Sequence, residues 1–364
     1  MAQGVLMVAI AGGLVALAAA TGWWRYALSP WRIPARRMTV RHLGLQVLDP
    51  SSVERVDAIL TGFAGGFNQM IARPSPKAWE IYCASLPALI RPFAHEGAAM
   101  GYTPRHLFRY DPREFEARIV RPRPEFRYLY YVGLGFWSGM RNHDARRIER
   151  VADGLDPLHR FLCFDGYGFK HAFFDYPRDA SLLRRLDLLS GYARNAAYQG
   201  VGRAFYFLFM DRPDVLIERI RALGRHAADV ASGLGLAAVF INPDRLDRAR
   251  ELARMLPAEW QAQFHLGMCF GLKARAINDL DQFDRDIATQ SPAVQAAIRA
   301  SIRECDRIEL LVRADGESDP YRRWRERVAD WMCANIEYPI ADLAIRAGSV
   351  SDRTIRAASG SERT

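Results

Sequence analysis

The sequence predicts an all-α protein: a tetratricopeptide-like array of α/α helical repeats, with a period of about 34 residues, behind one N-terminal transmembrane helix. Three observations predict it. Gly-x-Gly pairs recur along the chain, an amphipathic arginine-rich segment follows each pair, and the N-terminus contains a long uncharged stretch. Of the 364 residues, 50% are hydrophobic and 25% are charged, which is typical of a folded protein with a sizeable core. This composition excludes a wholly disordered chain, and the single long apolar stretch excludes a polytopic transporter.

The uncharged stretch covers residues 4–24. As a helix it would be about 31 Å long, close to the thickness of the hydrocarbon core of a bilayer. Trp23, Trp24 and Tyr26 stand at its end, where aromatic rings prefer the membrane interface, and five arginines follow between residues 25 and 41. The positive-inside rule therefore predicts a single-pass anchor in the cytoplasmic membrane, with the main domain facing the cytoplasm. A cleaved signal peptide and a packed core helix are the alternatives.

Four parts follow from this interpretation. Residues 1–26 form the anchor, and residues 27–50 form a basic juxtamembrane linker. Residues 51–340 form the helical-repeat domain, in which residues 319–332 look like a terminal capping helix. Residues 341–364 are rich in Ser, Arg and Gly, and we expect a disordered tail there.

The net charge is +9, from 50 Lys and Arg against 41 Asp and Glu, and nearly all of the positive charge is arginine. Such a surface is either simply solvated or attracted to an anionic membrane leaflet. No basic run with interleaved aromatic residues is present, so we expect no nucleic-acid partner. The five cysteines are scattered without a CxxC pair, which indicates reduced thiols rather than a disulfide framework or a zinc site.

The repeat is most regular in the middle of the chain, where the pairs that begin at Gly133, Gly166, Gly200 and Gly233 lie 33 or 34 residues apart. Extension of this spacing in both directions reaches Gly62, Gly97 and Gly267. We expect each unit to contain an apolar helix with the glycines and a second, amphipathic helix that an Asp opens. Glycine inside a helix costs about 1 kcal/mol relative to Ala. Close approach of a neighbouring helix, or of a ligand, is the expected reason for that cost.

Alignment of the units places several polar and aromatic residues on two equivalent helix faces. They are Glu96, Asp165, Gln199 and Arg203, with Phe136 and Phe169. A mostly apolar cleft with a few convergent polar groups is the usual form of a small-molecule site, so we expect these six residues to share one concavity. The alternative is a buried network in which Arg203 pairs with Asp165 or Glu96 without any ligand.

The densest group of reactive side chains lies in residues 163–176, CFDGYGFKHAFFDY. Asp165 or His171 could act as a general base there, and Tyr167 or Lys170 as an acid or an electrostatic partner. A histidine in an aromatic helix is also commonly a satisfied core residue. The candidate catalytic residues are therefore Asp165, Glu96 and His171. The candidate ligand-binding residues are Tyr167, Phe169, Lys170, Gln199, Arg203 and Phe136.

Motifs for metals and organic cofactors do not match. The aspartates of residues 279–286 resemble the magnesium motif of isoprenoid synthases, but the spacing is not DDxxD, and acids are expected at a helix start. His95 and Glu96 begin HEGAAM rather than HExxH. No nucleophile elbow and no phosphate-binding loop occur. We expect neither a metal nor a cofactor.

Several segments carry a resemblance to a known family. The most specific are EGAAM at 96–100 and DGYGF at 165–169, and YLYYVGLGFWSG, GVGRAFYF at 200–207 and SGLGLAAVF at 232–240 add to them. The chain thereby resembles the UnbL-type family of bacterial accessory proteins from enediyne polyketide gene clusters, over roughly residues 38–340. The family commonly has a histidine directly after GYGF, where this chain has Lys170 followed by His171. The resemblance implies a natural-product pathway and a polyene or polycyclic intermediate.

We therefore expect a membrane-anchored accessory protein of natural-product biosynthesis. It would bind, and could transform, an apolar small molecule in an aromatic pocket. One alternative is a non-catalytic helical-repeat scaffold that recruits other biosynthetic proteins. Another is an isoprenoid-diphosphate enzyme that uses the aspartates of residues 279–286. The sequence leaves open whether the protein is an enzyme.

Overall fold

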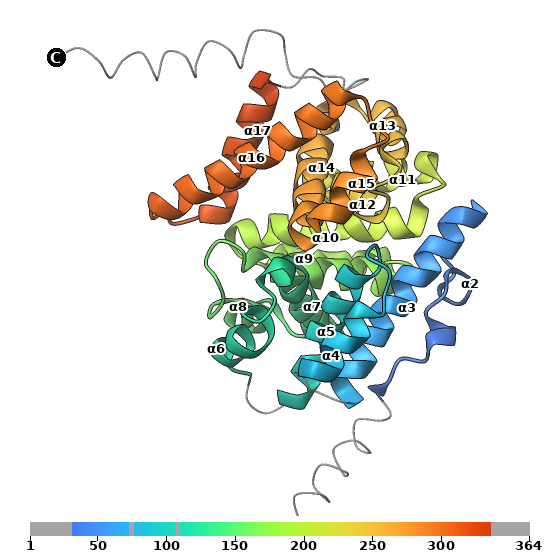
Figure 1. The fold of residues 1–364 in the computed structure, drawn as a ribbon, viewed down its shortest axis with the longest axis vertical. Coiled ribbons are helices and arrows are strands. Elements are labelled where there is room, and N and C mark those ends of the chain that lie inside the picture. The colour runs from blue at the N-terminus through green and yellow to red at the C-terminus, as the bar shows by residue number, and fades with distance from the viewer. Residues whose placement is uncertain (1–30, 73–75, 107–109, 336–364) are drawn as a thin grey trace, which may run out of the picture.

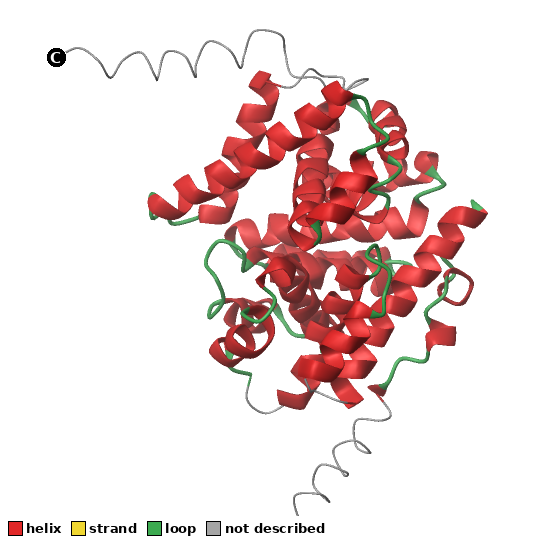
Figure 2. Cartoon of the chain, in the orientation of Figure 1, coloured by secondary structure: helices red, strands yellow, loops and turns green. Residues whose placement is uncertain are grey.

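A computed structural model describes residues 31–72, 76–106 and 110–335. Every regular element in these ranges is a helix, and none is a strand (Figure 2). The prediction of an all-α chain is therefore confirmed for the described residues. The predicted membrane-spanning stretch, residues 4–24, and the predicted tail, residues 341–364, lie outside them. Within the described ranges, no helix is both long enough and apolar enough to span a bilayer.

The glycine-bearing segments form one row of helices, which we call the inner helices (Figure 1). In chain order they are α3 (Pro50–Ala72), α5 (Arg91–Tyr102), α7 (Arg127–Met140), α9 (Phe161–Lys170), α10 (Gly191–Phe209), α12 (Ala227–Ile241) and α14 (Ala258–Asn278). Each packs against the next one along the chain. Shorter α-helices lie between most of them: α4 (Pro76–Ala84), α6 (Pro112–Phe115), α8 (Ala145–Ala152), α11 (Pro213–Arg221) and α13 (Leu246–Met255). A further short helix, α15 (Leu280–Ile287), follows α14. The glycine pairs thus lie inside the first helix of each pair, as predicted.

Single-turn and non-α segments complete the connections. A short helix, α2 (Val40–Leu43), precedes the row. The 3₁₀ segments are η2 (Ala35–Arg37), η3 (Thr103–His106), η5 (Pro124–Phe126), η7 (Ala180–Leu188) and η8 (Gly224–His226). Two π-helical turns, η4 (Glu116–Val120) and η6 (His171–Asp175), follow α6 and α9 without a break.

The Gly-x-Gly pair serves two neighbours at once. Residues two apart in a helix point about 200° from each other, so the two glycines face opposite sides. In α7, a Cβ on Gly133 would overlap the carbonyl oxygen of Glu96 in α5, and a Cβ on Gly135 would overlap that of Cys163 in α9. The first glycine meets the preceding helix in the same way at Gly97 with Phe63, Gly166 with Val132, Gly200 with Asp165, Gly233 with Gln199 and Gly267 with Ser232. The inner helices therefore touch through their backbones.

The row curves until helices near its two ends meet. Phe93 of α5 packs edge-on against Phe240 of α12, with ring centroids 5.3 Å apart. Arg275 of α14 donates one hydrogen bond to the carbonyl of Leu89 at 3.1 Å and another to the carbonyl of Phe240 at 2.7 Å. The contacts of Phe93 with Phe240 and of Arg275 with Leu89 join residues that lie more than 140 positions apart in the sequence. The faces inside the curve are therefore enclosed.

Residues 31–50, expected as a linker, run along α3. The side chain of Asn68 accepts a hydrogen bond from the backbone of Ile33 and returns one to it, both at 2.8 Å. Asp57 accepts a hydrogen bond from the backbone of Val40 at 2.6 Å. The side chain of Met38 is buried in the core. This segment therefore contributes to the enclosed face.

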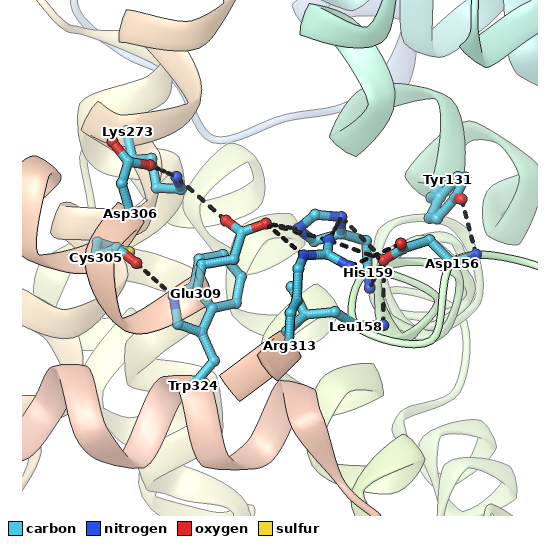
Figure 3. A network of polar contacts seen from close by, with 10 residues as sticks. All are labelled: Tyr131, Asp156, Leu158, His159, Lys273, Cys305, Asp306, Glu309, Arg313 and Trp324. Atoms are coloured by element: carbon cyan, nitrogen blue, oxygen red, sulfur yellow. Dashed lines mark hydrogen bonds and ion pairs between the residues drawn. The ribbon is translucent and has the colours of Figure 1, made fainter. Parts of the chain in front are cut away.

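The last two described helices, α16 (Pro292–Ala314) and α17 (Pro320–Asn335), form a hairpin that packs on α14. An ionic cluster joins α16 to the segment before α9, and we call it the clasp (Figure 3). Glu309 lies at its centre, 3.2 Å from Nε2 of His159 and 3.4 Å from Nζ of Lys273. Arg313 donates to Glu309 at 3.2 Å and to Asp156 at 2.9 Å. Burial opposes ionisation of Glu309, but His159, Lys273 and Arg313 hold its pKa at about 2.

Replacement of Gly135 by alanine should destabilise the protein by about 1–3 kcal/mol, because the added methyl group meets the backbone of α9, which cannot move aside cheaply. Alanine is the better helix former by about 1 kcal/mol, so a destabilised variant would show that the contact outweighs the helix propensity. Urea unfolding followed by circular dichroism measures the change.

Gly139→Ala is the matched control, one turn later in the same helix. Its Cβ would meet only aliphatic carbons of Lys170, at 3.0 Å or more. We expect a change of less than about 1 kcal/mol in either direction, since a flexible side chain can shift. Equal destabilisation by both variants would contradict the backbone-contact interpretation.

Removal of the charge at the centre of the clasp should release the hairpin. Glu309→Gln leaves Lys273 and Arg313 short of a counter-charge, and we expect a loss of about 3 kcal/mol of unfolding free energy. Limited proteolysis between α15 and α16 should accelerate. Glu304→Gln on the same helix breaks only a pair with the exposed Arg307, so it should cost less than about 1 kcal/mol.

Candidate functional site

Three charged side chains meet inside the curve of the inner helices, and we call them the buried triad. Arg203 of α10 lies in the middle. Its Nη1 donates to Oδ1 of Asp165 in α9, and its Nη2 lies 3.6 Å from Oε2 of Glu96 in α5. None of the three side chains is more than 8% exposed. The sequence prediction that these residues share one interior region matches this geometry, and so does the alternative pairing of Arg203 with the carboxylates.

Two apolar cavities adjoin the triad, one on each side. The phenylalanine chamber has about 430 Å³ of space that no protein atom fills and the tryptophan chamber about 570 Å³, open solvent included in both. The first is lined by Met38, Ile59, Leu60, Phe63, Phe93, Glu96, Phe136, Phe169, Phe173, Phe174, Arg203 and Phe207. The second is lined by Tyr128, Leu129, Val132, Leu162, Asp165, Arg203, Leu236, Phe240, Phe270, Ala274, Tyr321, Trp324 and Arg325. Arg203 belongs to both, Glu96 only to the first and Asp165 only to the second.

Burial dominates the ionisation of the triad. It raises the pKa of Glu96 to about 7, with Arg203 opposing the rise and Asp165 adding to it. Burial also raises the pKa of Asp165, although the Coulombic attraction and the hydrogen bond of Arg203 oppose it. Burial lowers the pKa of the Arg203 guanidinium, but the two carboxyl groups beside it outweigh that effect and raise this pKa above its ordinary value. Only Asp165 accepts a direct hydrogen bond from Arg203, so Glu96, with its pKa near 7, is the carboxyl group better placed to exchange a proton near neutral pH.

The glycine contacts fix the backbone on which the triad stands. The carbonyl oxygen of Glu96 meets Gly133, and the carbonyl oxygen of Asp165 meets Gly200. Both acids therefore sit at points where neighbouring helices touch, which leaves their Cα atoms little freedom. A rigid supporting shell of this kind is what an acid–base or binding site requires.

Aromatic rings surround the triad on the side of Glu96. The guanidinium of Arg203 lies 5.2 Å from the ring centroid of Phe169, within the range of a cation–π interaction. Phe169 stacks on Phe173 with centroids 5.4 Å apart, and Phe136 lies 5.8 Å from Phe169. The predicted ligand-binding residues Phe136 and Phe169 both line this chamber.

A family model described as "Protein of unknown function (DUF1702)" matches residues 27–332. The chain belongs to this family. The matched range includes the whole buried triad and every residue that lines the two chambers. No curated protein and no solved structure matches the chain.

Tyr167, Lys170 and His171 of this DUF1702 protein form a second polar cluster that lines neither chamber. Nδ1 of His171 lies 2.6 Å from Asp175, and Nζ of Lys170 lies 2.9 Å from the same carboxylate. The hydroxyl of Tyr167 donates to the backbone carbonyl of His143 at 2.6 Å. Tyr167 stands two positions after Asp165 in α9, on the opposite face of the helix. The structure thus separates these three residues from the triad.

The environment of His171 favours a neutral ring. Burial lowers its pKa to about 4, against the opposing effect of the Asp175 hydrogen bond. The side chain is fully buried, and Nε2 has no hydrogen-bond partner. His171 therefore has the protonation state of a base, but it borders neither cavity.

Gln199 lies behind the wall of the tryptophan chamber. It accepts a hydrogen bond from the hydroxyl of Tyr321 at 3.4 Å and donates one to Tyr192 at 3.5 Å. Sequence reasoning missed Arg325, which is buried, lines the tryptophan chamber and donates to the hydroxyl of Ser232 at 2.7 Å. A signal was present: Tyr321, Trp324 and Arg325 share one face of a helix by their spacing.

Two aspartates of residues 279–286 have clear structural roles. Asp279 caps α15 by accepting from the backbone of Gln282, and it lies 3.4 Å from Arg91. Asp284 pairs with Arg299 at 2.5 Å. Among the described residues, no group of three or more His, Cys, Asp or Glu side chains is arranged to hold a metal ion.

Replacement of the protonated acid should stabilise the protein at alkaline pH. The folded-state pKa of Glu96 is raised, so its stabilising contribution is complete below about pH 4.5 and is lost as the pH rises through about 7. The loss amounts to about 3 kcal/mol above pH 8. Glu96→Gln should remove this part of the pH dependence and unfold at a higher urea concentration at pH 8.

Glu251→Gln, at an exposed position on α13, is the control and should leave the pH profile of stability unchanged. A Glu96→Gln variant that is less stable than the natural protein at pH 8 would show that the ionised carboxylate is needed for folding.

Proposed function

We propose that the protein binds an elongated apolar molecule in the two chambers and transfers a proton to or from it at Glu96. The observation that carries this proposal is the position of the buried triad at the junction of two apolar cavities. A stable core does not require this arrangement, because apolar residues of similar volume would be equally stable or more so. A buried acid costs folding free energy, so its presence beside an apolar cavity favours a functional role over a purely structural one.

The apolar chemistry of the two cavities supports an apolar small-molecule ligand. The walls are apolar and aromatic, and the triad supplies the few polar groups that orient a ligand. Arg203 faces both chambers, so it is suited to contact a polar or unsaturated group near the middle of a long molecule.

We assign different roles to the predicted site residues. Glu96 is the proton donor, since its side chain is buried and its pKa of about 7 leaves it partly protonated near neutral pH. Asp165 holds the charge and orientation of Arg203, and it is the second candidate for proton transfer. His171, with Lys170 and Tyr167, takes a positioning role at the end of α9 through Asp175.

The cellular context completes the proposal. On the resemblance to the UnbL-type proteins, the ligand is a polyene or polycyclic intermediate of natural-product biosynthesis of the enediyne type. Residues 4–24 anchor the protein in the cytoplasmic membrane, so that an apolar intermediate enters from the lipid. The recurrent glycine-to-carbonyl contacts support descent of the inner helices from one repeat of about 34 residues.

Binding can be tested with the fluorescent polyene 1,6-diphenylhexatriene and the full-length protein in lipid nanodiscs. We expect saturable energy transfer from protein tryptophan, beyond the signal of empty nanodiscs. Leu60→Trp should reduce it at least about 10-fold, because the larger side chain fills the phenylalanine chamber. The volume-conserving Leu60→Met should keep it. Equal signals from Leu60→Trp and Leu60→Met, both folded by circular dichroism, would contradict binding in this chamber.

Metabolite profiles of a deletion strain test the chemical role. Complementation with Glu96→Gln should restore folded, membrane-bound protein but reduce the pathway product about 100-fold or more, the usual scale for loss of a general acid. Complementation with Asp165→Asn is measured in the same way. An immunoblot of this variant separates product lost through lower protein levels from product lost through chemistry. Normal product with folded Glu96→Gln would favour a non-catalytic binding or recruiting role.

A further inference from the structure

The lining of the phenylalanine chamber restricts its chemistry. Glu96 and Arg203 are the only residues with polar side chains in this lining, and the others are phenylalanines, aliphatic residues and Met38. The lining contains no hydroxyl, thiol, amine or imidazole that could attack a substrate. Besides the thioether of Met38, Glu96 is the one reactive group of the wall, and proton transfer is the reaction to which a buried carboxylic acid is suited.

The rings of the chamber are suited to a positively charged species. The faces of aromatic rings attract cations, and Arg203 already lies over the face of Phe169. Phe207 meets both Phe169 and Phe173 edge-on, with centroids 5.8 and 6.0 Å apart. Phe136 and Phe63 extend the aromatic wall, 5.3 Å from each other. None of these side chains would react with a carbenium ion as a lone-pair nucleophile would.

The charge balance of the triad also favours a cation after proton transfer. With a proton on Glu96, the positive charge of Arg203 and the negative charge of Asp165 cancel. Loss of that proton leaves the triad with one net negative charge at the wall of the chamber. A new positive charge in the ligand would then be paired across a short, water-poor distance.

We infer that the chamber acts on an alkene or polyene: Glu96 protonates a carbon–carbon double bond, and the phenylalanine rings stabilise the carbenium ion that results. This inference rests on the proposed function. The O–H bond of Glu96 breaks, and the π-electron pair forms a new C–H bond. A second double bond of the same molecule attacks the carbenium carbon and closes a ring. Loss of a proton to the Glu96 carboxylate re-forms a double bond and regenerates the acid.

The net reaction is a cycloisomerisation in which one π bond becomes one carbon–carbon σ bond. It consumes no oxidant, reductant or cofactor. The substrate class is an unsaturated hydrocarbon chain with at least two double bonds within reach of each other.

A stable cation and its neutral isostere test the inference. N,N-Dimethyldecylamine is protonated at pH 8, and 2-methyldodecane has the same shape without the charge. Both are titrated against bound diphenylhexatriene, with the full-length protein in nanodiscs. Because partition into lipid is the same for every variant, differences between variants report on the chamber. At pH 8, where Glu96 is ionised, we expect the amine to displace the probe at a concentration at least about 10-fold lower than the alkane.

Two substitutions separate the contributions to this preference. Phe136→Leu with Phe169→Leu should reduce the preference for the amine about 10-fold. The preference is the ratio of the alkane and amine concentrations that displace the probe, so a weaker affinity for the probe itself cancels from it. Glu96→Gln should reduce it as well, because the counter-charge is gone. Phe115→Leu is the matched control, since Phe115 is buried but lines neither chamber, and it should leave the preference unchanged.

The outcomes are distinguishable. Bound probe with no preference for the amine would overturn the carbenium inference and leave the binding proposal standing. A preference for the amine that survives the paired phenylalanine substitutions would also overturn the carbenium inference and leave the binding proposal standing. Failure of the probe to bind at all would overturn both.

Discussion

The whole architecture depends on the contact of glycine Cα atoms with carbonyl oxygens between neighbouring inner helices. Each Gly-x-Gly pair removes the side chain from both sides of its helix, so Gly133 and Gly135 let α7 touch α5 and α9 through the backbone. Side chains are then confined to the inside and the outside of the row. The inside carries the rings and the triad, and the outside carries the connecting helices. Glycine in seven helices is unfavourable by propensity, so tertiary packing must outweigh it.

The triad illustrates a second balance, between desolvation and pairing. Removal of Glu96, Asp165 and Arg203 from water is costly, and burial is the largest influence on the pKa of each. At Arg203 the two carboxyl groups outweigh the effect of burial on the pKa. At Glu96 the one cation, which it shares with Asp165, does not outweigh burial. The hydrogen bond from Arg203 favours the ionised form of Asp165, whereas Glu96, which accepts no such bond, is the carboxyl group suited to exchange a proton. A single cation between two unequally placed acids is therefore enough to separate their roles.

The C-terminal hairpin, which is not part of the row of inner helices, supplies part of the wall of the tryptophan chamber. α17 contributes Trp324 and Arg325 to the tryptophan chamber, while the clasp on α16 holds the hairpin to the body through Glu309. The indole of Trp324 donates to the carbonyl of Cys305 at 2.9 Å and so fixes α17 to α16. The chamber wall thus includes residues that are more than 100 positions from Asp165 in sequence. Its closure depends on ionic contacts, whereas the row itself depends on backbone packing.

The sequence by itself determined the helical class, the helices that carry the glycines, and the shared inward face of Glu96, Asp165 and Arg203, because local periodicity sets which residues share a helix face. It also placed Phe136 and Phe169 on that face. Tertiary structure alone decided that Gln199 lies behind the wall of the tryptophan chamber and that Arg325 enters it. The curvature of the row and the docking of α17 arise from contacts such as Arg275 with Leu89 and Tyr321 with Gln199, which join residues far apart in the chain. No local spacing records them, since their free energy exists only once the distant helices have met.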